Sequence, residues 1–326
     1  MNNQNRKSFL RTLGLLGASS LFANGTAISR ASAPEKLSHT EPRLVSNKKR
    51  VLRVAHLTDI HVKPSHIAEY GMAAALRAVN DMTDKPDFII NGGDAIMNEG
   101  ALTKGTVKEQ WGAFHNILKQ DNSLQVYHCI GNHDLFGFVL PSSDHAESKI
   151  WAMDEYGLKK PYYSFDRNGW HFIILDSVHG RNSVPGYLGK LDEEQMAWLR
   201  NELLTIPTQT HICIVSHIPI LAICSMFDGI FTNSMQRSVS STNMHEDAGE
   251  LVELFYQNRN VRACMSGHIH LIDYVNYLGV DYYCNGAVAG DWWKGDLKPF
   301  APSFSVINYF EDGSTSREVV YYKWKA

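Results

Sequence analysis

The chain has 326 residues, of which 44% are hydrophobic and 20% charged, an ordinary globular composition with enough chain for a sizeable core. Residues 1–33 hold four basic residues and no acidic one, so the rest has 27 Lys and Arg against 34 Asp and Glu, a net charge of −7. An acidic chain without a basic run is a poor candidate for binding a nucleic-acid polymer.

Residues 1–33 have the three-part pattern of an export signal. A basic start is followed by an apolar stretch at 13–23 and by an Ala-x-Ala sequence at 31–33. The apolar stretch is too short to span a bilayer. Arg6 and Lys7 stand where a twin-arginine signal has its arginine pair. We therefore expect an exported protein, periplasmic or extracellular, without a transmembrane span; a disordered basic tail on a cytoplasmic protein is the alternative.

The first half of the remaining chain alternates strand-like and helical patterns. Residues 34–49 are polar with two prolines and are predicted to be a linker. Short apolar runs at 51–57, 88–90 and 124–130 alternate with helical spacing at 67–82 and 107–118. Strand-length runs that alternate with helices predict an α/β sheet with crossover connections.

The second half adds hairpins to this pattern. A hairpin is expected at 162–175 around an Asn-Gly turn, followed by a helix at 192–204 and a strand at 211–215. Residues 220–246 show no period and are interpreted as a long loop. A helix at 248–258, a strand at 261–265 and hairpins at 274–284 and 304–322 complete the chain. The mixture predicts two packed sheets flanked by helices in a single domain, residues 50–326.

The cysteines are few and scattered. They are Cys129, Cys213, Cys224, Cys264 and Cys284. Their number is odd and no two form a Cys-x-x-Cys pair, which argues against a disulfide framework and against a thiolate metal site. We interpret them as small apolar core residues.

Polar motifs follow five of the apolar runs. In chain order they are Thr58-Asp59-Ile60-His61, Asn91-Gly92-Gly93-Asp94, Gly131-Asn132-His133-Asp134, Ser216-His217 and Gly267-His268-Ile269-His270. In α/β sheets, ligands bind beyond the carboxyl ends of the strands. Each motif alone is also compatible with a structural role at a strand end, but five in order predict one common rim of polar groups.

This rim has the composition of a transition-metal site. The candidate ligands are Asp59, His61, Asp94, Asn132, His217, His268 and His270. Carboxylate and imidazole together suit Fe, Mn or Zn, whereas Mg and Ca favour oxygen ligands. Seven ligands are too many for one ion but suit two ions that share a carboxylate. Two ions roughly 3.5–4 Å apart can clamp both oxygens of an in-line displacement at phosphorus.

The ordered motifs resemble those of the calcineurin-like metallophosphoesterase superfamily, over about residues 51–285. The resemblance implies a four-layer α/β/β/α sandwich with two mixed sheets and a dinuclear metal centre. In these terms Asp59, His61 and His270 would hold the first metal, Asn132, His217 and His268 the second, and Asp94 would bridge them. His133 would act on the leaving group or the phosphate, and Asp134 would orient the imidazole of His133.

Departures from particular branches narrow the expected substrate. Met97 occupies the position of the metal-binding tyrosine of purple acid phosphatases, and residues 93–98 lack the arginine found in protein phosphatases. The absence of that clamp for a dianionic monoester favours a phosphodiester, which has a single negative charge. The motifs at residues 59–61, 131–134 and 267–270 also resemble those of cyclic-nucleotide and glycerophosphodiester phosphodiesterases. We expect hydrolysis of a small phosphodiester by a metal-bridging hydroxide. A phosphomonoesterase and an inactive metal-binding surface module are the alternatives.

Two further features are open to two interpretations each. Trp292 and Trp293 are predicted either to line the substrate site or to cover a sheet edge, and the 220–246 loop either caps the pocket or is a tolerated insertion. His56 is a candidate to support the metal ligands. Ser216 is interpreted as structural, because the nearest base in the sequence, His217, is itself a predicted ligand. Nothing in the sequence indicates an oligomeric state.

Overall fold

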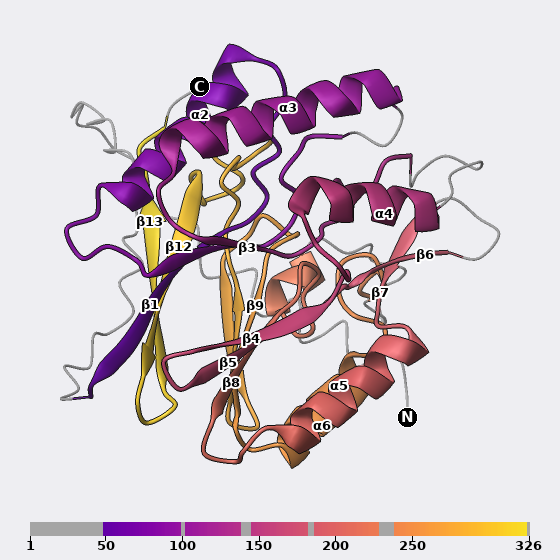
Figure 1. Cartoon of the computed structure of the whole chain (residues 1–326), viewed down its shortest axis with the longest axis vertical. Coiled ribbons are helices and arrows are strands. Elements are labelled where there is room, and N and C mark those ends of the chain that lie inside the picture. Colours follow the sequence, from indigo (N-terminus) through magenta and orange to yellow (C-terminus); the bar gives the residue numbers. More distant parts are fainter. Residues whose placement is uncertain (1–47, 99–101, 138–144, 182–185, 228–237, 325–326) are drawn as a thin grey trace, which may run out of the picture. The chain divides into compact units, whose positions relative to one another are not determined.

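The computed structural model describes residues 48–98, 102–137, 145–181, 186–227 and 238–324. They belong to one compact unit, Pro42–Ala326 (Figure 1). The predicted export signal and nearly all of the predicted linker lie outside the described residues. Among the described residues, no helix is long and apolar enough to cross a membrane.

Two mixed sheets form the centre of the fold (Figure 1). The first has the order β13 (Thr315–Tyr321), β12 (Ser303–Phe310), β1 (Arg50–Leu57), β2 (Phe88–Asn91) and β3 (Val126–His128). The second has the order β10 (Asp273–Tyr277), β11 (Val280–Cys284), β9 (Val261–Ser266), β8 (His211–Val215), β5 (Trp170–Ile174) and β4 (Tyr163–Arg167). Strands β1, β2 and β3 pair in parallel, as do β5, β8, β9 and β11.

Helices cover the outer faces of both sheets. The helices α2 (His66–Asn80), α3 (Lys104–Asp121) and α4 (His145–Tyr156) share an apolar core with the first sheet. The helices α5 (Glu193–Thr205) and α6 (Ala248–Gln257) share another core with the second sheet. A third core, including Leu52, Phe172 and Met265, lies between the sheets. The predicted four-layer sandwich is thus confirmed.

Local sequence accounts for where the helices begin. The side chains of Ser65 and Asp192 each accept a hydrogen bond from the backbone amide three residues further along the chain, as N-cap residues do.

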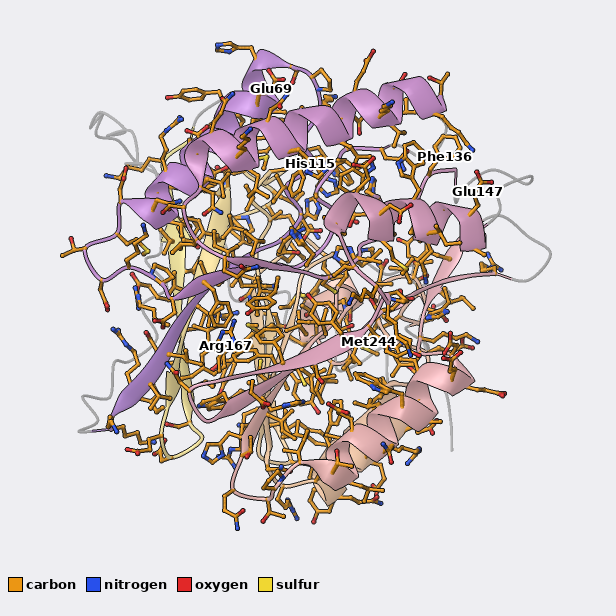
Figure 2. All side chains as sticks on the ribbon, viewed as in Figure 1. Glu69, His115, Phe136, Glu147, Arg167 and Met244 are labelled. Carbon is orange, nitrogen blue, oxygen red and sulfur yellow. The ribbon has the colours of Figure 1, made fainter. Side chains whose placement is uncertain are left out.

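Helix α4 lies beside α3, and the pair is joined by the ion pairs Lys104–Glu147 at 2.6 Å and His115–Glu155 at 2.9 Å (Figure 2). The first sheet therefore has three helices on its outer face.

The structure differs from the prediction in several elements. The expected strand at 124–130 is only β3, and three elements were not anticipated: α4 and the small hairpin of β6 (Val178–Gly180) and β7 (Tyr187–Gly189). These elements are short or carry no clear apolar stripe. The predicted 220–246 loop contains a 3₁₀ helix, η1 (Ile223–Phe227), and its residues 228–237 lie outside the described part. All five cysteines are buried and free, as expected.

Candidate metal centre

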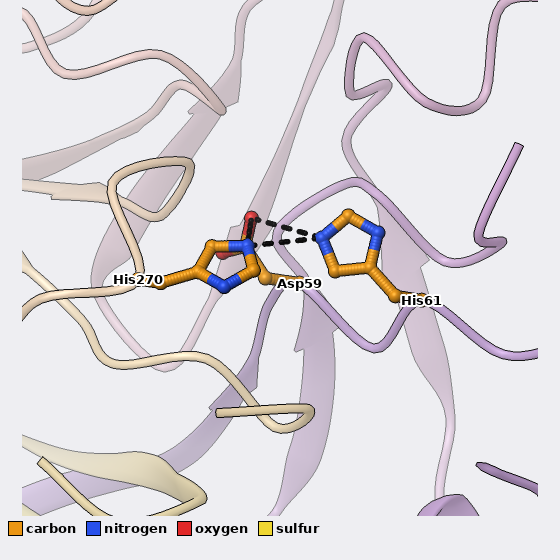
Figure 3. Close-up of side chains that lie close together, drawn as sticks. All are labelled: Asp59, His61 and His270. Atoms are coloured by element: carbon orange, nitrogen blue, oxygen red, sulfur yellow. Dashed lines mark hydrogen bonds and ion pairs between the residues drawn. The ribbon is translucent and has the colours of Figure 1, made fainter. Parts of the chain in front are cut away.

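The first group of predicted ligands comes from both sheets. Asp59 and His61 follow β1, and His270 follows β9. The Nε2 atoms of His61 and His270 lie 3.0 Å apart, and Oδ1 of Asp59 is 3.8 Å from the former and 3.4 Å from the latter (Figure 3). The three side chains are at most 5% exposed. They converge on one point, as the ligands of a single ion would.

The second group lies next to the first. Asp94 follows β2, Asn132 follows β3, and His217 and His268 follow β8 and β9. Nε2 of His217 lies 3.2 Å from Oδ2 of Asp94, 3.2 Å from Oδ1 of Asn132 and 3.3 Å from Nδ1 of His268. The structure therefore brings all seven predicted ligands together at the carboxyl ends of five strands.

Asp94 lies between the two groups. Its carboxylate is within 3.8 Å of Nε2 of His61 and within 3.2 Å of Nε2 of His217. It belongs both to the cluster with His61 and His133 and to the cluster with His217 and His268. Both contacts are made by Oδ2, whereas Oδ1 accepts from the amide of His133 at 2.7 Å. An oxygen that faces both groups could contact both ions, as expected of the bridging ligand that Asp94 is predicted to be.

The backbone at the site is held in an uncommon conformation. Asp59, His61, Asp94, His268 and His270 have φ angles of 56°, 48°, 57°, 70° and 60°. Left-handed backbone is rare for residues other than glycine and costs of order 1 kcal/mol each. Hydrogen bonds fix these turns, such as Asp59 N to Gly93 O at 3.0 Å and His61 N to Asp94 O at 2.9 Å. The turns after these strands thus direct the side chains into the two adjacent groups of predicted ligands.

Two glycines of the motifs make room for the carboxylates. A Cβ atom on Gly131 would lie 2.1 Å from Oδ1 of Asp94, and one on Gly267 would lie 2.3 Å from Oδ2 of Asp59. Backbone atoms also crowd Gly131, since its Cβ would lie 2.3 Å from the amide nitrogen of Asp94. These positions require glycine because the backbone passes directly against a carboxylate.

The hydrogen bonds of the imidazoles test whether a cation fits. Nδ1 of His217 lies 2.8 Å from the carbonyl oxygen of Gly92, and Nδ1 of His270 lies 2.8 Å from that of Gly290. Because a carbonyl only accepts, each Nδ1 carries a hydrogen, and the Nε2 of a neutral ring then has a lone pair. These lone pairs face carboxylate or amide oxygens, which also have only lone pairs to offer. Such a set of acceptors needs a cation at its centre.

The pKa shifts of the histidines also indicate that the site favours positive charge. Burial opposes protonation of His217, but the adjacent Asp94 carboxylate outweighs it and raises the pKa of His217 to about 9. Burial likewise opposes protonation of His270, and the Asp59 carboxylate still raises its pKa. By contrast, burial lowers the pKa of His268 to about 3. The carboxylates therefore favour a positive charge beside His217 and beside His270, which bound cations would supply in place of protons.

His133 is at the site, but its orienting partner is not the predicted one. Its Nδ1 lies 2.8 Å from the carbonyl oxygen of Met97 and 2.7 Å from that of Asn98. These carbonyls hold the hydrogen on Nδ1, so Nε2 is the nitrogen that can exchange a proton with a substrate. The ring is half-buried, edge-on to His61 at a centroid distance of 4.7 Å.

The prediction that Asp134 orients the imidazole of His133 is wrong. The buried carboxylate of Asp134 accepts hydrogen bonds from the amides of Asp94, Ala95 and Gly131 at 2.8–3.0 Å and from the hydroxyl of Tyr156 at 2.9 Å. It therefore joins the turns after β2 and β3. Spacing in the sequence placed Asp134 next to His133, but neighbouring residues in a turn need not point the same way.

His56 and Ser216 lie behind the ligands. His56 is fully buried, lies against Gly92 and contacts Asn285 through Nδ1 at 2.8 Å, which agrees with a supporting role. Ser216 is also buried, and its Oγ lies 2.7 Å from Ile218 O and 2.9 Å from Nε2 of His245. Burial supports the structural interpretation of Ser216.

His245 was not found from the sequence. It is separated from Ser216 by 29 positions, and its Nδ1 lies 2.9 Å from Oδ1 of Asp247. The other oxygen of Asp247 accepts from the amide of Leu191 at 2.9 Å. A serine, histidine and aspartate in series resemble a hydrolase triad, but Ser216 and His245 are only 2% and 3% exposed. This network is therefore a brace that joins the end of the 220–246 loop to the turn that carries His217.

Comparison with known proteins agrees with the geometry. A family model described as calcineurin-like phosphoesterase matches residues 52–271, two thirds of the chain. The chain belongs to the calcineurin-like phosphoesterase family. All seven predicted metal ligands of this calcineurin-like phosphoesterase lie within the matched segment, whereas the residues after His270 that contact the site lie beyond it.

Relatives of this calcineurin-like phosphoesterase include enzymes with different substrates. The chain is 25% identical over 288 residues to the 3′,5′-cyclic adenosine monophosphate phosphodiesterase CpdA of Escherichia coli, covering 82% of this chain and 89% of that protein. It is also 25% identical over 218 residues to the human serine/threonine-protein phosphatase CPPED1, covering 66% and 63%. A dimetal phosphatase from Danio rerio has a similar fold, with a TM-score of 0.58 at 16% identity, covering 84% of this chain and all of that one.

Proposed function

We propose that this protein is an exported dinuclear-metal phosphoesterase that hydrolyses a small phosphodiester. The observation that carries the proposal is the position of Asp94, which belongs both to the cluster with His61 and to the cluster with His217 and His268. Two adjacent groups that share a carboxylate match the requirement of two-metal phosphoryl chemistry. Bound there, two metal ions would activate water and neutralise charge on the phosphoryl oxygens.

The chain's own residues would supply the remaining functions. His133 is oriented by two backbone carbonyls, and its Nε2 would give a proton to the departing alcohol oxygen. Asp134 and its amide donors would hold the turn of His133 and the turn of Asp94 in a fixed relation.

The preference for a diester rests on the absence of an arginine from the sequence next to Asp94. Residues 93–98 contain no arginine, so the chain lacks there the bidentate donor that would grip a dianionic monoester. A diester has a single negative charge to neutralise, and the similarity to CpdA, a cyclic adenosine monophosphate phosphodiesterase, supports this direction. The similarity to CPPED1, a phosphatase, supports phosphomonoester hydrolysis as the second candidate.

A paired assay tests the proposal. Bis-p-nitrophenyl phosphate and p-nitrophenyl phosphate release the same chromophore, so the rates on protein loaded with Fe, Mn or Zn compare diester and monoester directly. We expect a higher kcat/KM for the diester and close to two ions per chain by elemental analysis. Preference for the monoester would replace the diesterase by the phosphatase, and absence of turnover with both ions bound would contradict an enzymatic function.

The proposed export is tested separately. We propose that residues 1–33 direct the chain to the periplasm or the medium, supported by their basic start, apolar stretch and Ala-x-Ala end. Fractionation of cells that produce the full chain should recover a shortened protein outside the cytoplasm, and removal of residues 2–33 should retain it inside. Recovery of the full-length chain in the cytoplasm would contradict export.

A further inference from the structure

The segment Val288–Trp293 holds the first group of ligands from one side. The amides of Val288 and Ala289 donate to the carbonyl oxygens of Thr58 and Asp59, both at 3.0 Å. Trp293 Nε1 donates to the carbonyl oxygen of His61 at 2.9 Å, and Gly290 O accepts from Nδ1 of His270 at 2.8 Å. This segment lies beyond the 52–271 region that the family model matches.

The two adjacent tryptophans of this segment have different surroundings. Trp293 is 5% exposed and packs against Trp324, with ring centroids 5.0 Å apart, so its position follows from core packing. Trp292 is half-buried and lies against the imidazoles of His61, His133 and His270, at centroid distances of 4.2, 5.0 and 4.9 Å. The two tryptophans therefore have different roles, which the sequence-based alternatives did not separate: Trp293 belongs to the core and Trp292 to the site.

The backbone of this pair is held in a conformation that large side chains avoid. Trp292 and Trp293 have φ angles of 52° and 64°. Bulky residues are outliers in the left-handed region, and such outliers concentrate at functional sites when the surrounding structure holds them. Hydrogen bonds from Trp293 N to Ala289 O and from Lys294 N to Asp291 O, both 2.8 Å, hold this turn. The turn directs one tryptophan to the core and the other to the histidines.

Trp292 adjoins the accessible side of the centre. Most of the predicted ligands are at most 5% exposed, whereas His133 and His268 are half-buried. A substrate would therefore reach the centre past these two histidines. Trp292 lies beside His133, the residue assigned to the leaving group, and Tyr187 lies edge-on to His268 at 6.0 Å.

We propose that Trp292 is a specificity-determining wall of the substrate site, selecting phosphate esters whose organic group carries a planar aromatic ring, such as a nucleobase. This inference rests on the proposed phosphoesterase function and names a substrate class for it. The flat apolar face of an indole stacks on a nucleobase but offers little to a small polyol such as glycerol. The ring's place next to His133 puts this surface where the leaving alcohol must be accommodated.

Binding of two related monophosphates to the metal-loaded protein tests the wall. Adenosine 5′-monophosphate and ribose 5-phosphate share the phosphate and the sugar, and ribose 5-phosphate has a hydroxyl at C1 where the nucleotide carries its base. The ratio of their dissociation constants by calorimetry therefore reports the contribution of the base. Base stacking on an aromatic side chain corresponds to roughly tenfold or more in affinity. We expect this preference in the wild type, its loss in Trp292→Leu and its partial retention in Trp292→Phe, with affinity for ribose 5-phosphate unchanged in all three.

Several outcomes would overturn the proposal. Equal affinity of the wild type for the two ligands would do so, as would an unchanged ratio in Trp292→Leu. Loss of bound metal from both variants would instead assign Trp292 to holding His61 and His270. Turnover of bis-p-nitrophenyl phosphate by the wild type separates this test from the proposed phosphoesterase function. Turnover without a base preference would contradict only the role of Trp292, whereas absence of turnover would contradict the phosphoesterase function itself.

Discussion

Ser216 and His245 are 29 positions apart in the chain, and their side chains meet in a buried contact of 2.9 Å behind the turn that carries His217. Through Asp247 the contact continues to the backbone of Leu191, next to the β6–β7 hairpin. Three chain segments that connect different strands are thus held together directly beneath a predicted metal ligand.

His245→Ala should therefore weaken both the fold and one side of the metal centre. The change removes one of the two hydrogen-bond partners of Asp247 and one of the two of Ser216, which costs about 1–3 kcal/mol of unfolding free energy. It also releases the turn of His217, so we expect lower affinity for the second ion and little change for the first. Thermal unfolding and metal titration measure the two effects, with His66→Ala, at an exposed position of α2, as the control. Unaltered metal binding in His245→Ala would show that the brace serves stability alone.

Gly131→Ala should disturb the centre although it removes no side chain. The added Cβ would meet Oδ1 of Asp94 at 2.1 Å and its amide nitrogen at 2.3 Å, so the turn after β2 must move. We expect a loss of about 1–3 kcal/mol of stability, the usual cost of overpacking, together with loss of bound metal. Gly112→Ala in α3 is the matched control, because nothing lies within 4 Å of its Cβ. It should be neutral or raise stability by up to about 1 kcal/mol.

His133→Ala should separate chemistry from metal binding. Its Nε2 is assigned to the leaving group, so turnover should fall by about 10²–10⁴-fold, the scale of general acid catalysis. Metal content should stay near two ions, because the seven predicted ligands remain. The loss should be smaller for substrates with good leaving groups such as p-nitrophenolate than for alkyl esters. A variant with full activity on alkyl esters would remove His133 from the mechanism.

Asp134→Asn, unlike His133→Ala, should affect stability and metal binding. The carboxylate of Asp134 accepts from three backbone amides and from the hydroxyl of Tyr156, and an asparagine would place its NH₂ group against some of these donors. We expect reduced stability and metal affinity, measured by denaturant unfolding and elemental analysis. Tyr156→Phe removes a single donor and serves as the milder comparison. If Asp134→Asn lost turnover with stability and metal content intact, the original assignment of Asp134 to His133 would be restored.

Metal binding should strengthen as pH rises. In the metal-free protein the Asp94 carboxylate, against the effect of burial, raises the pKa of His217 from 6.5 to about 9. An ion must therefore displace a proton at neutral pH, and each displaced proton gives up to about a tenfold gain in affinity per pH unit. Calorimetry between pH 6 and 9 in buffers of different ionisation enthalpy should detect this release. An affinity independent of pH would mean that His217 is not a ligand.

The same shift acts in the other direction on the metal-free fold. The pKa of His217 is higher in the folded than in the unfolded chain, so its protonation stabilises the folded state fully below about pH 6.5. That stabilisation is lost as pH rises towards 9. Protein treated with a chelator to remove metal should thus lose stability over this pH range, whereas metal-loaded protein should not. Urea unfolding midpoints across the range measure both curves.

The motifs could be placed from the sequence because their chemistry is local. Asp94 and His217 stand directly after apolar runs, and parallel strands bring such positions to one edge of a sheet. Contacts between distant segments could not be read in this way. His245 lies in an aperiodic stretch, and the side-chain partner of Asp134 is Tyr156 on a helix that was not predicted. The roles of Trp292 and Trp293 depend on a left-handed turn that no local sequence pattern indicates.

The origin of the ligands has a consequence for stability. The predicted first ion would be bound by Asp59 and His61 from the first sheet and by His270 from the second, and the predicted second ion by Asn132 from the first and by His217 and His268 from the second. Each ion would then act as a cross-link between the two halves of the sandwich at the edge where the apolar core between the sheets ends. Because ligands that bind only the folded state stabilise it by mass action, metal supply would set the melting temperature as well as the catalytic rate.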